Sequence, residues 1–148
     1  MEKYPQYELY KFTRKLHLNK EKMLPKNCNN RCVYSTIINR CYYSSYLYVL
    51  EWLFEKYKFK PLSKNSFDNT DEFVTEHKQV RDELKDVNYN NISTNLFDLF
   101  ILRKKADYDP FSAISDNELD RAMCLMERIF QTLKIWFFFL FFDNWVLQ

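Results

Sequence analysis

Hydrophobic residues recur at helical spacing along most of this 148-residue chain, and short polar stretches separate the segments in which they do so. The first such segment covers residues 7–23, and Pro25 closes it. We expect one helix there, with an apolar side formed by Tyr7, Tyr10, Leu16 and Met23.

The second segment runs from Arg31 to Tyr57 without a proline, which predicts one long helix. Its apolar stripe is broad enough to face other helices on more than one side. The small pair Ser44 and Ser45 would let a neighbouring helix come close. The stripe consists of Val33, Ile37, Cys41, Ser45, Val49 and Trp52, and it is widened by Ile38, Tyr42, Tyr46 and Leu53.

Two polar loops flank a shorter helix in the middle of the chain. Residues 59–70 contain one proline, two serines and two asparagines, and Thr70 or Asp71 can cap a helix over residues 71–84. The polar segment 85–94 predicts the second loop. The inward positions of the helix are expected to be Phe73, Val74, His77, Val80 and Leu84.

Two further helices complete the predicted fold. One covers residues 94–106 and stops before Pro110, which disfavours helical backbone at the residue that precedes it. The other begins at a capping box formed by Ser115 and Glu118. Their inward positions are Leu96, Leu99, Phe100, Leu102 and Arg103 in the first, and Leu119, Ala122, Met123, Met126, Ile129, Phe130 and Leu133 in the second. We therefore expect residues 1–148 to form a single all-α domain, an antiparallel up-and-down bundle of four or five helices.

The C-terminal tail, residues 134–148, is rich in aromatic residues. Its uninterrupted apolar run from Ile135 to Phe142 is eight residues long, whereas a helix that crosses a membrane needs about twenty. The tail is not a transmembrane helix by this criterion. We expect it to cover the bundle or a second subunit, with contact to a membrane surface as the alternative.

The chain contains no glycine, although average usage is about 7%. Walker phosphate loops, dinucleotide-binding fingerprints and nucleophile elbows all need backbone conformations or close approaches that a Cβ atom blocks. Enzyme classes built on these loops are therefore excluded, and no cofactor is expected.

The net charge of +2 is too small to indicate nucleic-acid binding by itself. Residues 1–30 carry seven Lys or Arg and three Glu, so either a phosphate-binding arm or a solvated helix face fits that segment. The N-terminus lacks the apolar stretch of a secretory signal, which predicts a cytoplasmic protein with reduced thiols. Cys28 and Cys32 have neither the spacing nor the nearby His of a zinc site, so no metal site is expected.

Three stretches combine polar and aromatic residues in a characteristic order: "NRCYYSSYLYVLEWL", "EHKQVRDEL" and "LRKKADYDPF". The order is similar to that of small stand-alone HEPN proteins (higher eukaryotes and prokaryotes nucleotide-binding). In those proteins an Arg-x-Tyr-Tyr helix and a His-containing helix precede an Arg-x-x-Ala-Asp-Tyr segment. The resemblance covers residues 36–133. The matching residues here are Arg40, Tyr42 and Tyr43, then His77, then Arg103, Ala106, Asp107 and Tyr108.

The resemblance implies a helical bundle that dimerises, with a cleft across the dimer interface. Many HEPN proteins are metal-independent ribonucleases of toxin–antitoxin or antiviral defence systems, and a minimal nucleotidyltransferase often serves as the antitoxin. In their active motif an Arg polarises the phosphate, and a nearby His moves protons during attack by the ribose 2′-hydroxyl. Related toxins that carry a motif tyrosine are silenced by nucleotidylation, which would fall on Tyr108 here.

The sequence departs from this motif where the His is expected, since residues 107–109 are Asp, Tyr and Asp. The usual acid/base residue is therefore missing. One interpretation of the segment is structural. Arg103 pairs with Asp107 four residues later, while the Tyr108 ring packs inside and its hydroxyl anchors the following turn.

The other interpretation is functional: Arg103 binds a phosphate in a cleft, with Arg40 or His77 opposite. The candidate catalytic residues are then Arg103, Asp107, Tyr108 and His77, and the candidate RNA- or nucleotide-binding residues are Arg40, Arg103 and Lys104. A hydrogen-bonded packing role is the alternative for His77. The tyrosine series can either stack bases or fill core and interface positions, and it consists of Tyr42, Tyr43, Tyr46 and Tyr48.

These observations predict an RNA- or nucleotide-binding protein of a toxin–antitoxin or antiviral defence system, expected to be a homodimer. It would be a metal-independent ribonuclease if the remaining residues replace the missing His. The alternative is a non-catalytic interaction module that binds a partner protein, such as a nucleotidyltransferase, through its aromatic tail and long helix.

Overall fold

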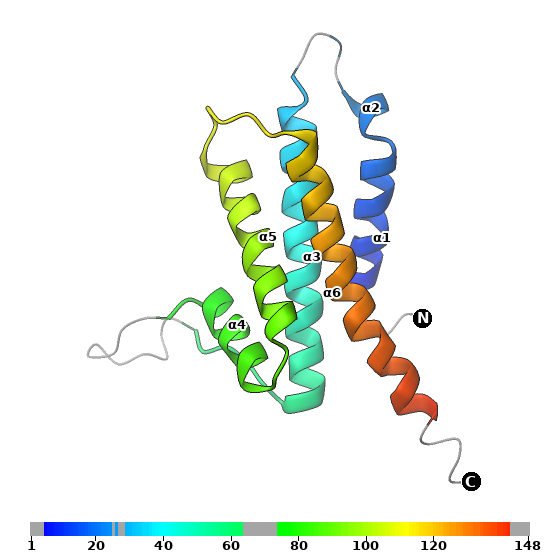
Figure 1. Ribbon diagram of the computed structural model, residues 1–148, viewed down its shortest axis with the longest axis vertical. Coiled ribbons are helices and arrows are strands. Elements are labelled where there is room, and N and C mark those ends of the chain that lie inside the picture. Colours follow the sequence, from blue (N-terminus) through cyan, green and yellow to red (C-terminus); the bar gives the residue numbers. More distant parts are fainter. Residues whose placement is uncertain (1–4, 25, 27–28, 64–73, 143–148) are drawn as a thin grey trace.

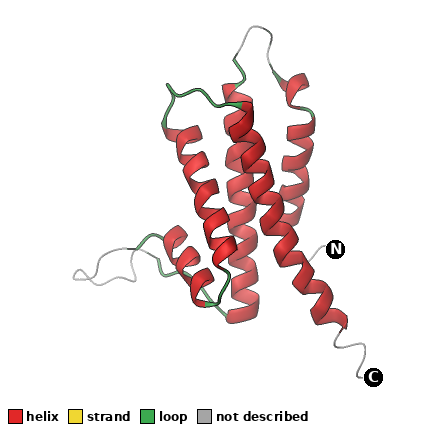
Figure 2. Cartoon of the chain, in the orientation of Figure 1, coloured by secondary structure: helices red, strands yellow, loops and turns green. Residues whose placement is uncertain are grey.

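The computed structural model describes residues 5–24, 26, 29–63 and 74–142, with side chains described up to residue 133. All regular structure in this part of the chain is helical (Figure 2), so the all-α prediction is confirmed. The helices are α1 (Pro5–Leu18), α2 (Lys20–Met23), α3 (Arg31–Tyr57), α4 (Glu76–Asp86), α5 (Asn90–Tyr108) and α6 (Asp116–Phe142).

The long helix α3 lies at the centre of the molecule and packs against α1, α5 and α6 (Figure 1). α1 and α5 run in one direction and α3 and α6 run in the opposite direction, with the short α4 beside α5 (Figure 1). A helix with neighbours on several sides must bury most of its circumference. This explains its broad apolar stripe, of which Val33, Ile37, Ile38, Cys41, Tyr42, Ser45, Tyr46, Val49, Trp52 and Leu53 are all buried.

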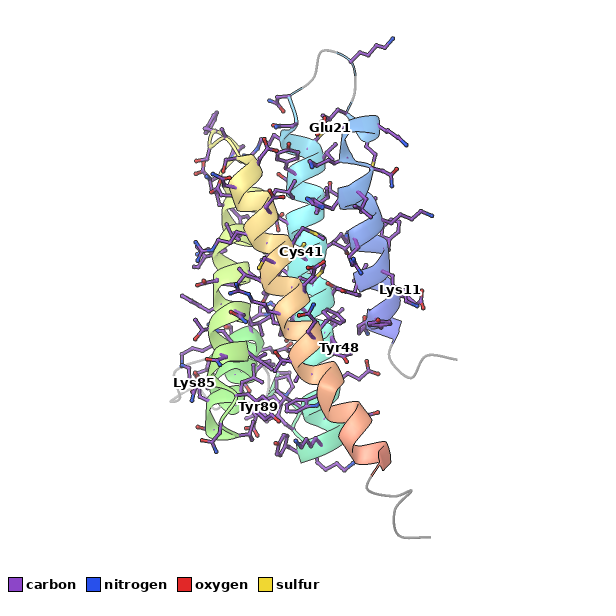
Figure 3. The ribbon with its side chains drawn as sticks, turned by 45° about the vertical axis from the view of Figure 1, so that its right-hand side comes forward. Lys11, Glu21, Cys41, Tyr48, Lys85 and Tyr89 are labelled. Carbon is purple, nitrogen blue, oxygen red and sulfur yellow. The ribbon has the colours of Figure 1, made fainter. Side chains whose placement is uncertain are left out.

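Small side chains bring α3 and α6 close together, as the serine pair predicts. Ser44 and Ser45 are fully buried, and Ser44 Oγ lies 3.3 Å from Met126 Sδ of α6. One turn earlier, Cys41 Sγ lies 3.5 Å from Met123 Sδ. Cys41 and Tyr48 of α3, both buried, mark this central layer of the molecule (Figure 3). Each fully buried apolar side chain here contributes about 1.5–3 kcal/mol relative to an exposed one.

The bounds predicted for α3 from the absence of proline are those observed. The helix ends at Lys58, which adopts the left-handed conformation with φ 59° and stands where a glycine usually caps a helix. Its N–H donates to Phe54 O at 3.0 Å. In a chain without glycine, the helix therefore ends with a residue whose Cβ makes this conformation cost about 1 kcal/mol.

The prediction of one helix over residues 7–23 is wrong, because Asn19 separates α1 from α2. The Asn19 side-chain amide donates to Lys15 O at 2.9 Å, and its backbone leaves the helical region at φ −109° and ψ 13°. An asparagine that bonds to a preceding carbonyl competes with the helix ladder, and here it ends the helix five residues early.

The predicted bounds of the two middle helices also need correction. α4 begins at Glu76 rather than at residue 71, because Thr75 is the N-cap and its side chain accepts from the Lys78 N–H. Thr70, Asp71 and Phe73 lie outside the described residues. The loop predicted over residues 85–94 is much shorter, since α5 already begins at Asn90. Asn88 makes the turn with φ 67°, a conformation that asparagine tolerates better than most residues.

The last two helix boundaries lie close to the prediction. α5 ends at Tyr108, two residues after the predicted end and directly before the residue that precedes Pro110. α6 begins with the capping box: the Ser115 N–H donates to Glu118 Oε2 at 2.9 Å, and the Glu118 N–H donates to Ser115 Oγ at 3.2 Å. The predicted inward residues of this helix are all buried, namely Leu119, Ala122, Met123, Met126, Ile129, Phe130 and Leu133.

Three of the four cysteines are described, and Cys32, Cys41 and Cys124 are free thiols. Cys28 and the side chains of the aromatic tail lie outside the described residues, as does any contact of that tail with the bundle. Within the described part, none of the helices has the length and apolarity needed to cross a membrane.

Candidate functional site

Polar and aromatic side chains from three helices gather on the side of the molecule where α3, α4 and α5 meet. Most of the residues that the sequence singles out lie here, and two that it does not, Asn39 and Arg81, join them. We call this the Arg103 face. It comprises Asn39, Tyr42, Tyr43, His77, Arg81, Arg103, Asp107 and Tyr108.

Arg103 is the central residue of this face, and its side chain is only 13% exposed. Its Nε lies 2.6 Å from Asp107 Oδ2, one turn later on the same helix, and Nη2 donates to the Tyr108 hydroxyl at 3.2 Å. The guanidinium also lies between two rings, 5.4 Å from the centroid of Tyr43 and 5.1 Å from that of Tyr108. The Nε–Oδ2 contact is an ion pair that lacks the alignment of a hydrogen bond.

Asp107 is held from the neighbouring helix as well. Asn39 of α3 donates to both carboxylate oxygens, at 3.3 Å and 3.1 Å. The predicted ion pair is thus present, and it is fixed to α3 by the Asn39 amide, which was not among the predicted site residues. This support orients the carboxylate toward Arg103.

Tyr108 does not pack inside, contrary to the structural interpretation of the sequence. The residue is 67% exposed, and its hydroxyl accepts from Arg103 instead of anchoring the next turn. The turn after α5 is held by Arg31 at the start of α3, which donates to Asp109 O at 2.7 Å and to Ala106 O at 3.2 Å. A guanidinium that satisfies these terminal carbonyls leaves Tyr108 free to face solvent.

His77 of α4 contacts Tyr42 and Tyr46 of α3. Its Nδ1 lies 2.8 Å from the Tyr42 hydroxyl, and its ring stands edge-on to Tyr46 at 4.4 Å between centroids. Burial lowers the pKa of His77, and the positive charges of Arg103 and Arg81 lower it further. The imidazole is therefore neutral at neutral pH.

The hydrogen bond from Tyr42 also defines which nitrogen of His77 carries the proton. Burial raises the pKa of Tyr42, so its hydroxyl stays protonated. Because Nδ1 is the partner found for that hydroxyl among the described residues, we assign the hydroxyl as the donor and Nδ1 as the acceptor. The His77 proton then sits on Nε2, so the neutral ring presents a donor there.

The remaining candidates lie at the edge of this group or away from it. Lys104 is exposed, with its ammonium 5.8 Å from the Phe100 centroid, and Arg81 lies 5.4 Å from the same centroid. Arg40 is also exposed, and among the described residues no ion pair or hydrogen bond joins it to Arg103. The structure therefore groups Lys104 with the Arg103 face and does not show a link from Arg40 to it.

The tyrosines of α3 separate into core and surface positions. Tyr42, Tyr46 and Tyr48 are buried, whereas Tyr43 is half-buried against Arg103. Base stacking on the three buried rings is therefore sterically blocked. No group of three or more His, Cys, Asp or Glu side chains in the described ranges is arranged to hold a metal ion.

Comparison with known proteins adds no relative: no protein-family model, curated protein or solved structure matches the chain.

Proposed function

We propose that this chain is a HEPN-like helical bundle that binds the phosphate groups of RNA or nucleotides at the Arg103 face, in a toxin–antitoxin or antiviral defence setting. The observation that carries the proposal is the position of Arg103. Its guanidinium is held between the Tyr43 and Tyr108 rings, and it is oriented by Asp107. The alternating directions of the four long helices are in keeping with such a bundle.

The guanidinium keeps donor capacity for a ligand. Nε faces Asp107 and Nη2 donates to Tyr108, while none of the described residues accepts a hydrogen bond from Nη1. Arg is the residue best suited to phosphate recognition, because its planar donors match phosphate oxygens. The neighbouring cations Lys104 and Arg81 add positive charge at the same face.

Binding is better supported than cleavage by the state of the acid/base candidates. A general base must accept a proton, but Nδ1 of His77 is occupied by the Tyr42 hydroxyl, and Nε2 already carries a proton. Tyr108 is exposed to solvent, and its hydroxyl oxygen already accepts a hydrogen bond from Arg103. We therefore propose a phosphate-binding site in which cleavage is slow or absent.

The proposed homodimer would form along α5. Phe97 and Ile101 are 45% and 48% exposed, and their spacing places them with Tyr108 on one side of the helix. Contact across this stripe would set two Arg103 faces beside one interface. We expect wild type to sediment as a dimer and Ile101→Arg to sediment as a monomer. A monomeric wild type would contradict this part of the proposal.

The same stripe supports the second candidate function, a non-catalytic module that binds a partner protein such as a nucleotidyltransferase. Phe111, almost fully exposed in the turn after α5, extends the apolar surface toward α6. The two candidates differ in what they require of Arg103. A partner-binding module needs the exposed apolar residues but not the guanidinium.

The test is a binding titration of fluorescently labelled RNA and of a nucleotide against wild type, Arg103→Ala and a matched control, Arg121→Ala. Arg121 also pairs with an aspartate, at 2.7 Å, but on the α5–α6 side. We expect Arg103→Ala to weaken RNA binding about tenfold or more, as loss of a charged hydrogen bond to phosphate does. Arg121→Ala should bind as wild type does. Equal weakening in both variants, or no binding by wild type, would contradict the proposal.

Cleavage is measured separately with a mixed RNA pool in the presence of a chelator. We expect wild type to leave the pool intact on the timescale of ordinary ribonuclease turnover. Product that wild type makes and Arg103→Ala does not would instead identify a metal-independent ribonuclease that works without the family's usual His.

A further inference from the structure

A second site lies at the C-terminal end of α3, at the opposite end of the bundle from the last turn of α5 (Figure 1). Three aromatic rings surround the ammonium of Lys56 there. Its Nζ lies 5.1 Å from the centroid of Trp52, 5.3 Å from that of Tyr57 and 5.5 Å from that of Tyr89. All three distances are within the range of a cation–π contact.

The three rings support one another, so the site does not depend on Lys56 for its shape. Trp52 stands edge-on to Tyr57 at 5.6 Å between centroids and edge-on to Tyr89 at 4.8 Å. Trp52 is buried and belongs to α3, while Tyr89 is the residue before α5. The left-handed turn at Asn88 brings Tyr89 back against α3. Figure 3 shows Tyr89 at this end of the molecule.

The neighbouring lysines show that this arrangement is specific to Lys56. Lys58 and Lys60 each lie over a single ring, that of Phe54, at 5.8 Å and 4.9 Å. One ring under a lysine is a common surface contact, whereas three rings around one cation form a cage.

We propose that Trp52, Tyr57 and Tyr89 form a binding site for a quaternary ammonium group, and that Lys56 occupies it when no ligand is bound. The faces of three rings stabilise a diffuse positive charge without offering hydrogen-bond acceptors. A primary ammonium uses such a surface poorly, because its three N–H groups need acceptors. In the cage, Lys56 Nζ donates to the Tyr89 hydroxyl at 3.4 Å. A quaternary ammonium has no N–H groups, so it loses no hydrogen bond when it enters the cage.

Lys56 can leave the cage because it is exposed and its stem is flexible. The ammonium would then move into water, where its N–H groups are fully hydrated. A ligand must therefore compete with Lys56, and removal of the lysine should raise the apparent affinity. This proposal is independent of the Arg103 face, since no residue is shared between the two sites.

The experiment titrates choline and Nε-trimethyl-lysine into wild type, Lys56→Ala and the control Lys58→Ala, followed by NMR of the Trp52 indole N–H. Choline and trimethyl-lysine share the quaternary group and distinguish a free small molecule from a modified side chain as the source. Lys56→Ala should bind at least one of them about tenfold more tightly than wild type, and Lys58→Ala should bind as wild type does.

A neutral isostere separates cation recognition from simple apolar packing. 3,3-Dimethyl-1-butanol has the shape of choline without its charge, and we expect Lys56→Ala to bind it at least about tenfold more weakly than choline. Equal affinity for the two compounds would overturn the proposal. So would a folded Lys56→Ala protein that binds neither ammonium compound, or equal affinity of wild type and Lys56→Ala. Tyr89→Leu in the Lys56→Ala background should abolish binding, and retention would place the ligand elsewhere.

Discussion

Two arginine–aspartate pairs, one within α5 and one between α6 and α5, have nearly the same separation but very different surroundings. The Arg103–Asp107 pair is 2.6 Å apart, with side chains 13% and 22% exposed. The Arg121–Asp98 pair is 2.7 Å apart, with side chains 60% and 32% exposed. Water screens the second pair, and exposed pairs of this kind contribute about 0–1 kcal/mol. The comparison shows that the distance between the charged atoms alone does not identify which pair contributes more to stability.

The residues around the Arg103 pair allow its charge to interact strongly with an approaching group, and the Arg121 pair lacks such surroundings. Two tyrosine rings shelter the guanidinium, Asn39 orients the carboxylate, and the positive charge reaches His77 on another helix. A sheltered, oriented charge interacts strongly with whatever approaches it, including a phosphate. Five predictions test this difference between the pairs, from the largest expected effect to the smallest.

The largest expected effect is on stability. Arg103→Ala leaves the Asp107 side chain, which is 22% exposed, without its cation and removes the packing between two rings, so we expect the free energy of unfolding to fall by about 1–3 kcal/mol. Arg121→Ala should lower it by less than about 0.5 kcal/mol. Urea unfolding followed by circular dichroism measures both. Equal losses would mean that burial does not distinguish the pairs.

The amide that supports Asp107 should have a smaller but measurable effect. Asn39→Ala removes two hydrogen bonds to a carboxylate, and we expect a loss of about 1 kcal/mol in the free energy of unfolding. In the Asp107→Ala background the same substitution should cost much less, because its partner is gone. An additive double mutant would contradict a direct role of Asn39 in holding the carboxylate.

The reach of the Arg103 charge is tested at His77. Because the Arg103 charge lowers the pKa of His77, Arg103→Met should raise it, while Arg121→Met should leave it unchanged. NMR titration of the His77 ring reports both. A pKa of His77 that stays the same in Arg103→Met would show that the charge does not reach α4.

The same coupling predicts the direction of the pH dependence of stability. The folded state holds the pKa of His77 below the unfolded value of about 6.5, so between these two values the unfolded state binds more protons. Stability should therefore fall as the pH drops below about 6.5, and this part of the fall should be shallower in Arg103→Met. His77→Asn should remove the contribution of His77 to the pH dependence of stability altogether.

The smallest expected effect is the response to salt. Raising NaCl from 0.05 M to 1 M, a range over which the Debye length shortens from roughly 14 Å to 3 Å, should weaken the exposed Arg121 pair by a few tenths of a kcal/mol. The coupling energy of the Arg103 pair should change less over the same range of salt. Double-mutant cycles at both salt concentrations measure the two coupling energies, and an equal loss would indicate equal exposure to solvent.

The helices that the sequence predicts best are those whose limits are encoded locally. Pro110 ends α5 and the Ser115–Glu118 box starts α6, so these boundaries needed no tertiary information. One error arose at the Thr75 N-cap, which starts α4 later than predicted, and two arose at asparagine residues. Asn19 interrupts the first helix and Asn88 compresses a predicted ten-residue loop into a tight turn. Asparagine occurs in both helical and loop sequences, so composition could not show that Asn19 would interrupt a helix or that Asn88 would form a tight turn.

The candidate site could be predicted only in its local part. The Arg103–Asp107 pair follows from four-residue spacing on one helix, and it is present. Asn39 and Arg81 were not predicted, because their roles depend on how α3 and α4 pack against α5. Arg81 did carry a signal, since it is one helical turn after His77. Tyr108 was placed inside because aromatic residues usually are, but Arg31 already fills the space that holds the turn.

The most direct test of the phosphate site is RNA binding by Asp107→Asn, with wild type beside it. Asparagine keeps the shape of Asp107 and an oxygen that accepts from Asn39, but it removes the negative charge that competes with phosphate for Arg103. A binding site at Arg103 predicts that Asp107→Asn binds labelled RNA several-fold more tightly than wild type, with a folded protein by circular dichroism. RNA affinity that is unchanged or lower in a folded Asp107→Asn protein would contradict that site and leave the ion pair as a structural feature of α5.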